Sequence, residues 1–279
     1  LGGMFGWGLA DFFDKKPIDQ VGDTVSLAWG HMFGTITLFL ILLYQFGIRG
    51  QKITLPDTLP IWLGIIFFGI LQAIVYFFVY KGFGKGQVGL LSPVFASFSG
   101  LTAIVSISVL GEVVSGYLLF GLAVLFVGIT LINIDISALR SRRLRFSQIP
   151  GFKEVGFATI LAVVWTLSWD KFVGGKDWLL FTFFMYASMT ATIFIIAIVQ
   201  KINLFVITPK IWKFLALIGI TEIVAYLAIT WGYGATTRTS VVALLSGAFS
   251  IPTNVISRVL IKERVTDIQN IGSIVIING

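Results

Sequence analysis

Glu222 stands out because it lies in the middle of the apolar run "LALIGITEIVAYLAIT", which occupies residues 215–230. A carboxylate inside such a run is costly in a membrane, so it usually faces a cavity and carries out a function there. Gln72 lies at the corresponding mid-run position, 150 residues earlier. We expect the two polar groups to converge near the centre of the molecule and to bind substrate. A protonated Glu222 hydrogen-bonded between helices is the structural alternative.

Two tyrosines follow these polar residues at the same spacing. Tyr76 comes four residues after Gln72, and Tyr226 comes four residues after Glu222. Four residues are about one helical turn, so each tyrosine shares a helix face with its polar neighbour. We therefore expect Tyr76 and Tyr226 to line the same cavity. The wider set of candidate aromatic residues also contains Trp7, Trp29, Trp165, Tyr186 and Trp231.

Trp29 and His31 complete the predicted substrate-binding set. His31 is the one histidine of the chain. It could contribute to the binding site or form a hydrogen bond between helices, and the sequence leaves both roles open. Interfacial anchoring is an alternative role for tryptophans such as Trp29.

The remaining carboxylates and prolines favour structural roles. Glu112 and Glu263 lie in short connections, where we expect each to accept hydrogen bonds from the N–H groups that open the next helix. Asp11 and Asp170 lie near run ends, apart from a shared core. Pro93 and Pro252 are expected to interrupt their helices, since proline lacks the N–H group.

The composition requires a membrane environment for these residues. Of the 279 residues, 57% are apolar and only 12% are charged, with a mean hydropathy of +0.95. Ordinary soluble domains contain about 25% charged residues. Ten apolar runs are visible, and a transmembrane helix needs roughly 20 such residues. The runs cover residues 1–13, 25–47, 59–80, 87–109, 115–135, 154–173, 178–199, 211–230, 237–260 and 268–279.

The two halves of the chain form an internal repeat. An offset of 150 pairs Gly69 with Gly219, and Gly82 with Gly232. After one inserted residue, an offset of 151 pairs the following residues: Phe98 with Phe249, Ser106 with Ser257, Glu112 with Glu263 and Gly121 with Gly272. A repeat of five helices starts and ends on opposite membrane sides, so its second copy is inverted, as in many secondary transporters.

We therefore predict an all-α integral membrane protein with ten transmembrane helices, arranged as two inverted five-helix repeats around a central cavity. The first repeat covers residues 1–135, a basic linker covers 136–153, and the second repeat covers 154–279. The first and last helices are expected to be truncated. Small residues spaced by four, such as Gly2 and Gly6 or Gly30 and Gly34, allow close helix contacts that either slide or stay fixed.

Several segments resemble one known family. Residues 86–133, from "GQVGLLSPVFASFSG" to "FVGITLIN", are similar to the last two helices of an EamA repeat, and residues 237–279 are similar to a second copy. The segments "GWGLADFFDKK" and "WTLSWDKFV" resemble the starts of the two repeats. This resemblance implies the drug/metabolite transporter superfamily, whose EamA-type members mostly export or exchange amino acids and other small metabolites.

Other classes of protein are disfavoured by the residues. The chain has no cysteine and one histidine, so thiolate chemistry, disulfides and multi-histidine metal centres are excluded, and we expect no metal or cofactor. No metal-helix, serine-elbow or phosphate-loop motif is present, which argues against an intramembrane enzyme. No channel filter is recognisable. The net charge of +7 fits loops facing lipid headgroups better than nucleic-acid binding.

The expected function is therefore secondary active transport of a small metabolite such as an amino acid, by export or exchange, in the cell membrane. Glu222 could bind a proton and couple transport to it, as carboxylates in proton relays do. An intramembrane enzyme or a channel remains the alternative. The expected partners are the substrate, the bilayer and the proton, and the protein is a monomer or a homodimer. Most basic residues lie on the linker side, which indicates that this side is cytoplasmic.

Overall fold

The computed structural model describes residues 1–52, 54–85, 88–133 and 150–256, and these segments are helices joined by short connections. The first half contains α1 (Gly2–Val21), α2 (Asp23–Leu42) with its π-helical end η1 (Leu43–Ile48), α3 (Leu59–Lys85), α4 (Val88–Ser108) and α5 (Gly116–Asn133). The second contains α7 (Phe152–Val173), α8 (Trp178–Val199), α9 (Pro209–Ala235), α10 (Thr239–Gly247) and α11 (Ser250–Ile256).

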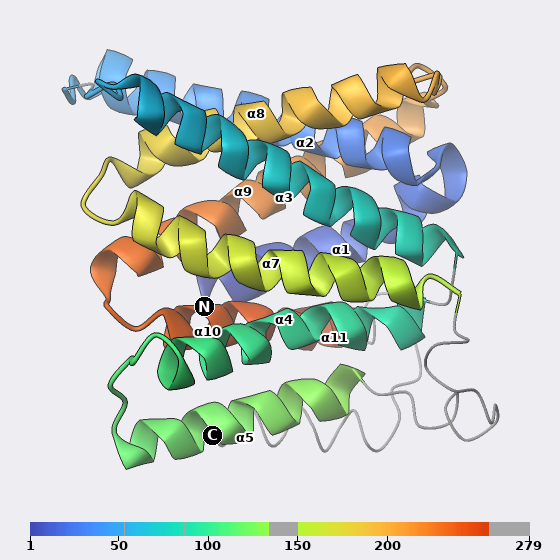
Figure 1. Cartoon of the computed structure of the whole chain (residues 1–279). Coiled ribbons are helices and arrows are strands. Elements are labelled where there is room, and N and C mark those ends of the chain that lie inside the picture. The colour runs from blue at the N-terminus through green and yellow to red at the C-terminus, as the bar shows by residue number, and fades with distance from the viewer. Residues whose placement is uncertain (53, 86–87, 134–149, 257–279) are drawn as a thin grey trace.

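Five of these helices are long and apolar enough to cross a membrane. They are α2 with η1, α3, α7, α8 and α9. In Figure 1 the long helices run back and forth across the molecule, with the α1–α2, α3–α4 and α8–α9 connections at one end. The described part of the chain is thus an all-helical, multi-pass membrane protein. The predicted run 268–279 lies outside the described residues.

The first helix is longer than its apolar run predicted. The run ends at residue 13, whereas α1 continues through Pro17 to Val21. The added turns carry polar residues, among them Asp14, which hydrogen-bonds within the bundle. The expected end of the helix was wrong because polar residues that face other helices interrupt an apolar pattern without interrupting the helix.

The two prolines behave differently. The predicted run 237–260 is divided into α10 and α11, and the break falls at Ala248 and Phe249. Pro252 cannot donate to Ala248, four residues earlier, and its ring crowds that carbonyl. This interruption was correctly predicted. Pro93 lies within α4, which continues unbroken to Ser108, so the interruption expected there was wrong.

The contacts between helices form pairs, in which a helix of the first half and a helix of the second half make corresponding contacts. α1 packs on α9, and α7 packs on α3; α2 packs on α9, and α8 packs on α3. Similarly, α4 packs on α7, while α10 and α11 pack on α1. The remaining large contacts are α2 with α8 and α4 with α10. Because each contact joins the two halves, neither half forms a separate core.

Two glycines that lie 150 residues apart allow close backbone contacts between helices. A Cβ atom added to Gly219 on α9 would lie 2.5 Å from the Gly30 carbonyl oxygen and 2.5 Å from the Gly34 nitrogen on α2. A Cβ atom added to Gly69 on α3 would lie 2.6 Å from the Met185 carbonyl oxygen on α8. The backbone on the other side cannot move aside as a flexible side chain would.

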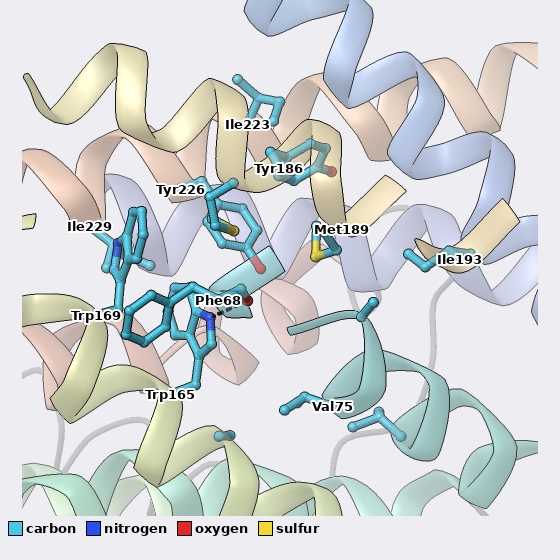
Figure 2. Packing of buried hydrophobic residues seen from close by; sticks show 14 of the residues in the cluster. Phe68, Val75, Trp165, Trp169, Tyr186, Met189, Ile193, Ile223, Tyr226 and Ile229 are labelled. Carbon is cyan, nitrogen blue, oxygen red and sulfur yellow. Dashed lines mark hydrogen bonds between the residues drawn. The ribbon is translucent and has the colours of Figure 1, made fainter. Parts of the chain in front are cut away.

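Large aromatic side chains fill the space between α3, α7, α8 and α9. The Trp165 indole stacks on Trp169 with ring centroids 5.6 Å apart, and its Nε1 donates to the Phe68 carbonyl oxygen at 3.0 Å. Figure 2 shows these rings beside Tyr226, with Tyr186 above. The aromatic core borders directly on the polar residues of the centre.

Replacing Gly219 with alanine should lower the stability by about 1–3 kcal/mol, because the added methyl group overpacks a backbone contact. Gly234→Ala is the matched control, since no atom lies within 4 Å of its added Cβ on the same helix. That control should be neutral or slightly stabilising, because alanine favours helices more than glycine. Thermal unfolding in detergent measures both, and equal melting temperatures would contradict the role of this contact.

Candidate functional site

Glu222 is buried in the middle of α9, where its side chain contacts both halves of the chain. The residue is 3% exposed. Its Oε2 atom accepts a hydrogen bond of 2.7 Å from the Tyr186 hydroxyl on α8. Its Oε1 atom lies 3.4 Å from Nε2 of His31 on α2. The carboxylate therefore has an imidazole on one side and a phenol on the other.

The tautomer of His31 follows from its other nitrogen. Nδ1 lies 2.9 Å from the Leu27 carbonyl oxygen, which can only accept, so Nδ1 carries a hydrogen. Nε2 is buried and has no hydrogen-bond partner. The ring stacks on Tyr186 at 5.3 Å, with 13° between the planes. An added proton can thus reside on His31 Nε2 or on the Glu222 carboxylate. In either case the protonated group faces an acceptor on the other residue.

Gln72 and the two predicted tyrosines form a second part of the site. Gln72 Nε2 on α3 donates to the Tyr226 hydroxyl at 2.8 Å, and that hydroxyl lies 3.4 Å from the Tyr76 hydroxyl. Tyr226 also packs against Tyr186, with ring centroids 5.3 Å apart. The structure thus brings together five of the six predicted residues: Glu222, Gln72, Tyr76, Tyr226 and His31.

Trp29 lies apart from this cluster. Its Nε1 donates to the Leu204 carbonyl oxygen at 2.7 Å, in the α8–α9 connection, and its ring packs edge-on against Trp212 at 4.8 Å. Among the other candidate aromatics, Trp7 contacts the Tyr226 ring edge-on, while Trp231 is 60% exposed. Trp29 therefore links α2 to the α8–α9 connection and lies outside the central cluster.

Two aspartates of α1 lie near the central cluster and were missed by the sequence interpretation. Asp14 accepts hydrogen bonds from the Tyr80 hydroxyl and from Ser26 Oγ. Asp11 and Asp14 both interact electrostatically with Glu222. The expectation that Asp11 lies near a run end was wrong, because α1 continues to Val21. The Asp-x-x-Asp spacing, which places two carboxylates on one helix face, was the signal available.

Asp170 and Glu112 lie together at one end of the bundle instead. Asp170 accepts from the Thr239 hydroxyl at the first residue of α10. Glu112 accepts from Ser106 Oγ at 2.5 Å, from Ser240 N at 3.0 Å and from Ser240 Oγ. Glu112 was expected to cap the next helix, α5, but it caps α10 of the other half. Glu263 lies outside the described residues.

The central cluster is therefore rich in carboxylates, hydroxyls and aromatic faces. In the described part of the chain, no three acidic or histidine side chains are arranged to hold a metal ion. Such a set of groups can bind and release a proton, and it can hold a cation or a hydrogen-bond donor. An ionisable cluster buried in a helical membrane bundle is typical of membrane proteins that handle ions or small solutes.

Comparison with known proteins agrees with this class. Residues 1–134 match the EamA-like transporter family. The chain is also similar to a solved crystal structure of a protein, with a TM-score of 0.70 and 16% sequence identity, over 99% of this chain and 94% of that chain. That similarity shows the fold alone. No curated protein matches the chain.

Tyr226→Phe should lower the stability by about 1–3 kcal/mol, because it leaves the buried Gln72 amide without its acceptor. Tyr117→Phe is the matched control, since Tyr117 is 90% exposed. Thermal unfolding of the purified variants measures the difference. If the two variants melt together, the hydrogen bond from Gln72 contributes nothing to the fold.

Proposed function

We propose that this protein is a secondary active transporter that exports or exchanges a small metabolite by alternating access, coupled to protons. The match of residues 1–134 to the EamA-like transporter family supports membrane transport. The observation that carries the proposal is the buried Glu222–His31 pair. A pair that can gain one proton in the middle of a membrane bundle is a suitable coupling site.

Proton and substrate would compete for this site. Among the described residues, the titratable groups near Glu222 come from five helices: Asp11 and Asp14 from α1, His31 from α2, Tyr76 and Tyr80 from α3, Tyr186 from α8, and Tyr226 from α9 itself. A protonated carboxyl group is a poor partner for a positive or donor group. Binding one ligand at a time produces antiport.

The arrangement of helices supports two inverted five-helix repeats. If each helix of the first half is replaced by its counterpart in the second half and the reverse, the contact of α1 with α9 becomes the contact of α7 with α3. α3 and α9, which carry equivalent glycines, run in opposite directions in Figure 1. Inverted repeats allow one central site to open to either side in turn. We propose that run 268–279 completes a ten-helix protein.

Alternating access also needs contacts that close one end and can be released. Glu112 and Asp170 hold the start of α10 at the end opposite the α3–α4 connection. These hydrogen bonds join the α4–α5 connection and α7 to the same helix start. We propose that they keep this end closed and break when it opens.

Glu222→Gln should abolish proton-driven exchange, reducing it by more than about tenfold, since one charge-assisted interaction is worth roughly 1.5–3 kcal/mol. The variant should still fold, because an amide can accept the Tyr186 hydrogen bond. Glu154→Gln is the matched control, as Glu154 forms a surface ion pair with Lys85 at 2.5 Å. Uptake of metabolites into vesicles under an imposed pH gradient is the measurement. Wild-type coupling in Glu222→Gln would place the proton site elsewhere, while conversion of solute or passage of current would indicate an enzyme or a channel.

Glu112→Gln should open its end of the bundle more often, because a charged acceptor of three hydrogen bonds is lost. The chain has no cysteine, so a single Thr102→Cys on α4 provides a clean reporter at a buried position. We expect maleimide labelling to be about tenfold faster in the Glu112→Gln background, as for one charge-assisted hydrogen bond. The Glu154→Gln background serves as the control. Unchanged labelling would show that Glu112 does not hold this end closed.

A further inference from the structure

The fixed charges around Glu222 are negative. Asp11 and Asp14 both interact electrostatically with it. Within the described residues, the hydrogen-bond and ion-pair partners of these three carboxylates are tyrosine and serine hydroxyls and the His31 imidazole; none is a lysine or arginine. Like charges at close range in a low dielectric repel one another strongly, and a positive ligand would relieve that repulsion.

Two buried acceptor atoms of the site receive no hydrogen bond. His31 Nε2 points at Glu222 from a residue that is 1% exposed, and it is the acceptor nitrogen of the neutral ring, since Nδ1 donates to Leu27. Gln72 Oε1 is the free acceptor of an amide that is 6% exposed. Trp7 Nε1 is an unpartnered donor nearby, but it is neutral. An ammonium group supplies three donors and no acceptor.

The two aspartates differ in how much of their hydrogen-bonding capacity is already used. Asp14 already accepts from Tyr80 and Ser26. The Asp11 carboxylate has no hydrogen-bond or ion-pair partner among the described residues, and Asp11 is exposed although it lies in mid-helix. Asp11 lies one helical turn after Trp7, which contacts the Tyr226 ring, so it shares the face of α1 that borders the site. Tyr186 and Tyr226, whose rings contact each other beside Glu222, offer aromatic faces that favour a cation.

We infer that the substrate is an organic cation that bears a free ammonium or guanidinium group and no carboxylate, bound between Asp11 and Glu222. This inference rests on the proposed function and narrows its substrate from amino acids to amines. The carboxylate of a zwitterionic amino acid would need a positive partner, and the described part of the site supplies none apart from a protonated His31, which is already turned toward Glu222.

The test compares amines with the amino acids that differ from them by one carboxylate. Binding of phenethylamine and phenylalanine, and of agmatine and arginine, is measured by calorimetry on the purified full chain at neutral pH. We expect each amine to bind at least about tenfold more tightly than its amino acid, and Asp11→Asn to weaken amine binding about tenfold, as for one charge-assisted hydrogen bond. Asp19→Asn is the matched control, an exposed carboxylate on the same helix. It should change nothing.

Each contrary outcome has a defined meaning. Equal or tighter binding of the amino acids, no binding of either amine, or unchanged amine binding in Asp11→Asn would overturn the cation site. Calorimetry needs no gradient, so an amine that binds through Asp11 but does not exchange for protons in vesicles would support the site and refute proton-coupled transport. Proton-driven exchange of the amino acids alone would refute the cation site and leave proton coupling intact.

Discussion

The constraint on which the centre of this protein depends is the cost of a carboxylate among apolar helices. Glu222 is tolerated because Tyr186 donates to one of its oxygens and His31 faces the other. These partners come from α8 and α2, both of which pack closely on α9. Satisfying one buried charge therefore fixes the positions of three helices relative to one another. The aromatic core of Trp165, Trp169 and Phe68 supports the same group from the α7 side.

The polar site is asymmetric although the helix contacts are matched. Gln72 lies 150 residues before Glu222, and the first half supplies an amide there while the second supplies a carboxylate. Gln72 donates a hydrogen bond to Tyr226, whereas Glu222 accepts one from Tyr186. The acidic pair of α1 adds to the charge on one side only. Matched helix contacts can thus position a site whose chemistry differs between the two halves.

Much of this arrangement could be predicted from the sequence, for physical reasons that also explain the failures. Apolar runs located the helices, and the mid-run positions of Gln72, Tyr76, Glu222 and Tyr226 indicated a shared polar site, because polar groups inside apolar helices face one another rather than lipid. The run-based boundary at residue 13 concealed Asp11 and Asp14, since polar residues facing other helices look like the end of an apolar segment. The partners of Trp29 and Glu112 lie 175 and 128 residues away, and no local pattern carries that information.

The close backbone contacts at Gly69 and Gly219 have a consequence for how the two halves can diverge. An added methyl group at either position meets backbone atoms of the facing helix, so no rotamer change relieves it. Gln72 and Glu222 show that polar positions 150 residues apart can differ in charge. Gly69 and Gly219 have no such freedom, because a methyl group at either position would clash with backbone atoms. A glycine is therefore needed at both positions, whatever polar residues lie nearby.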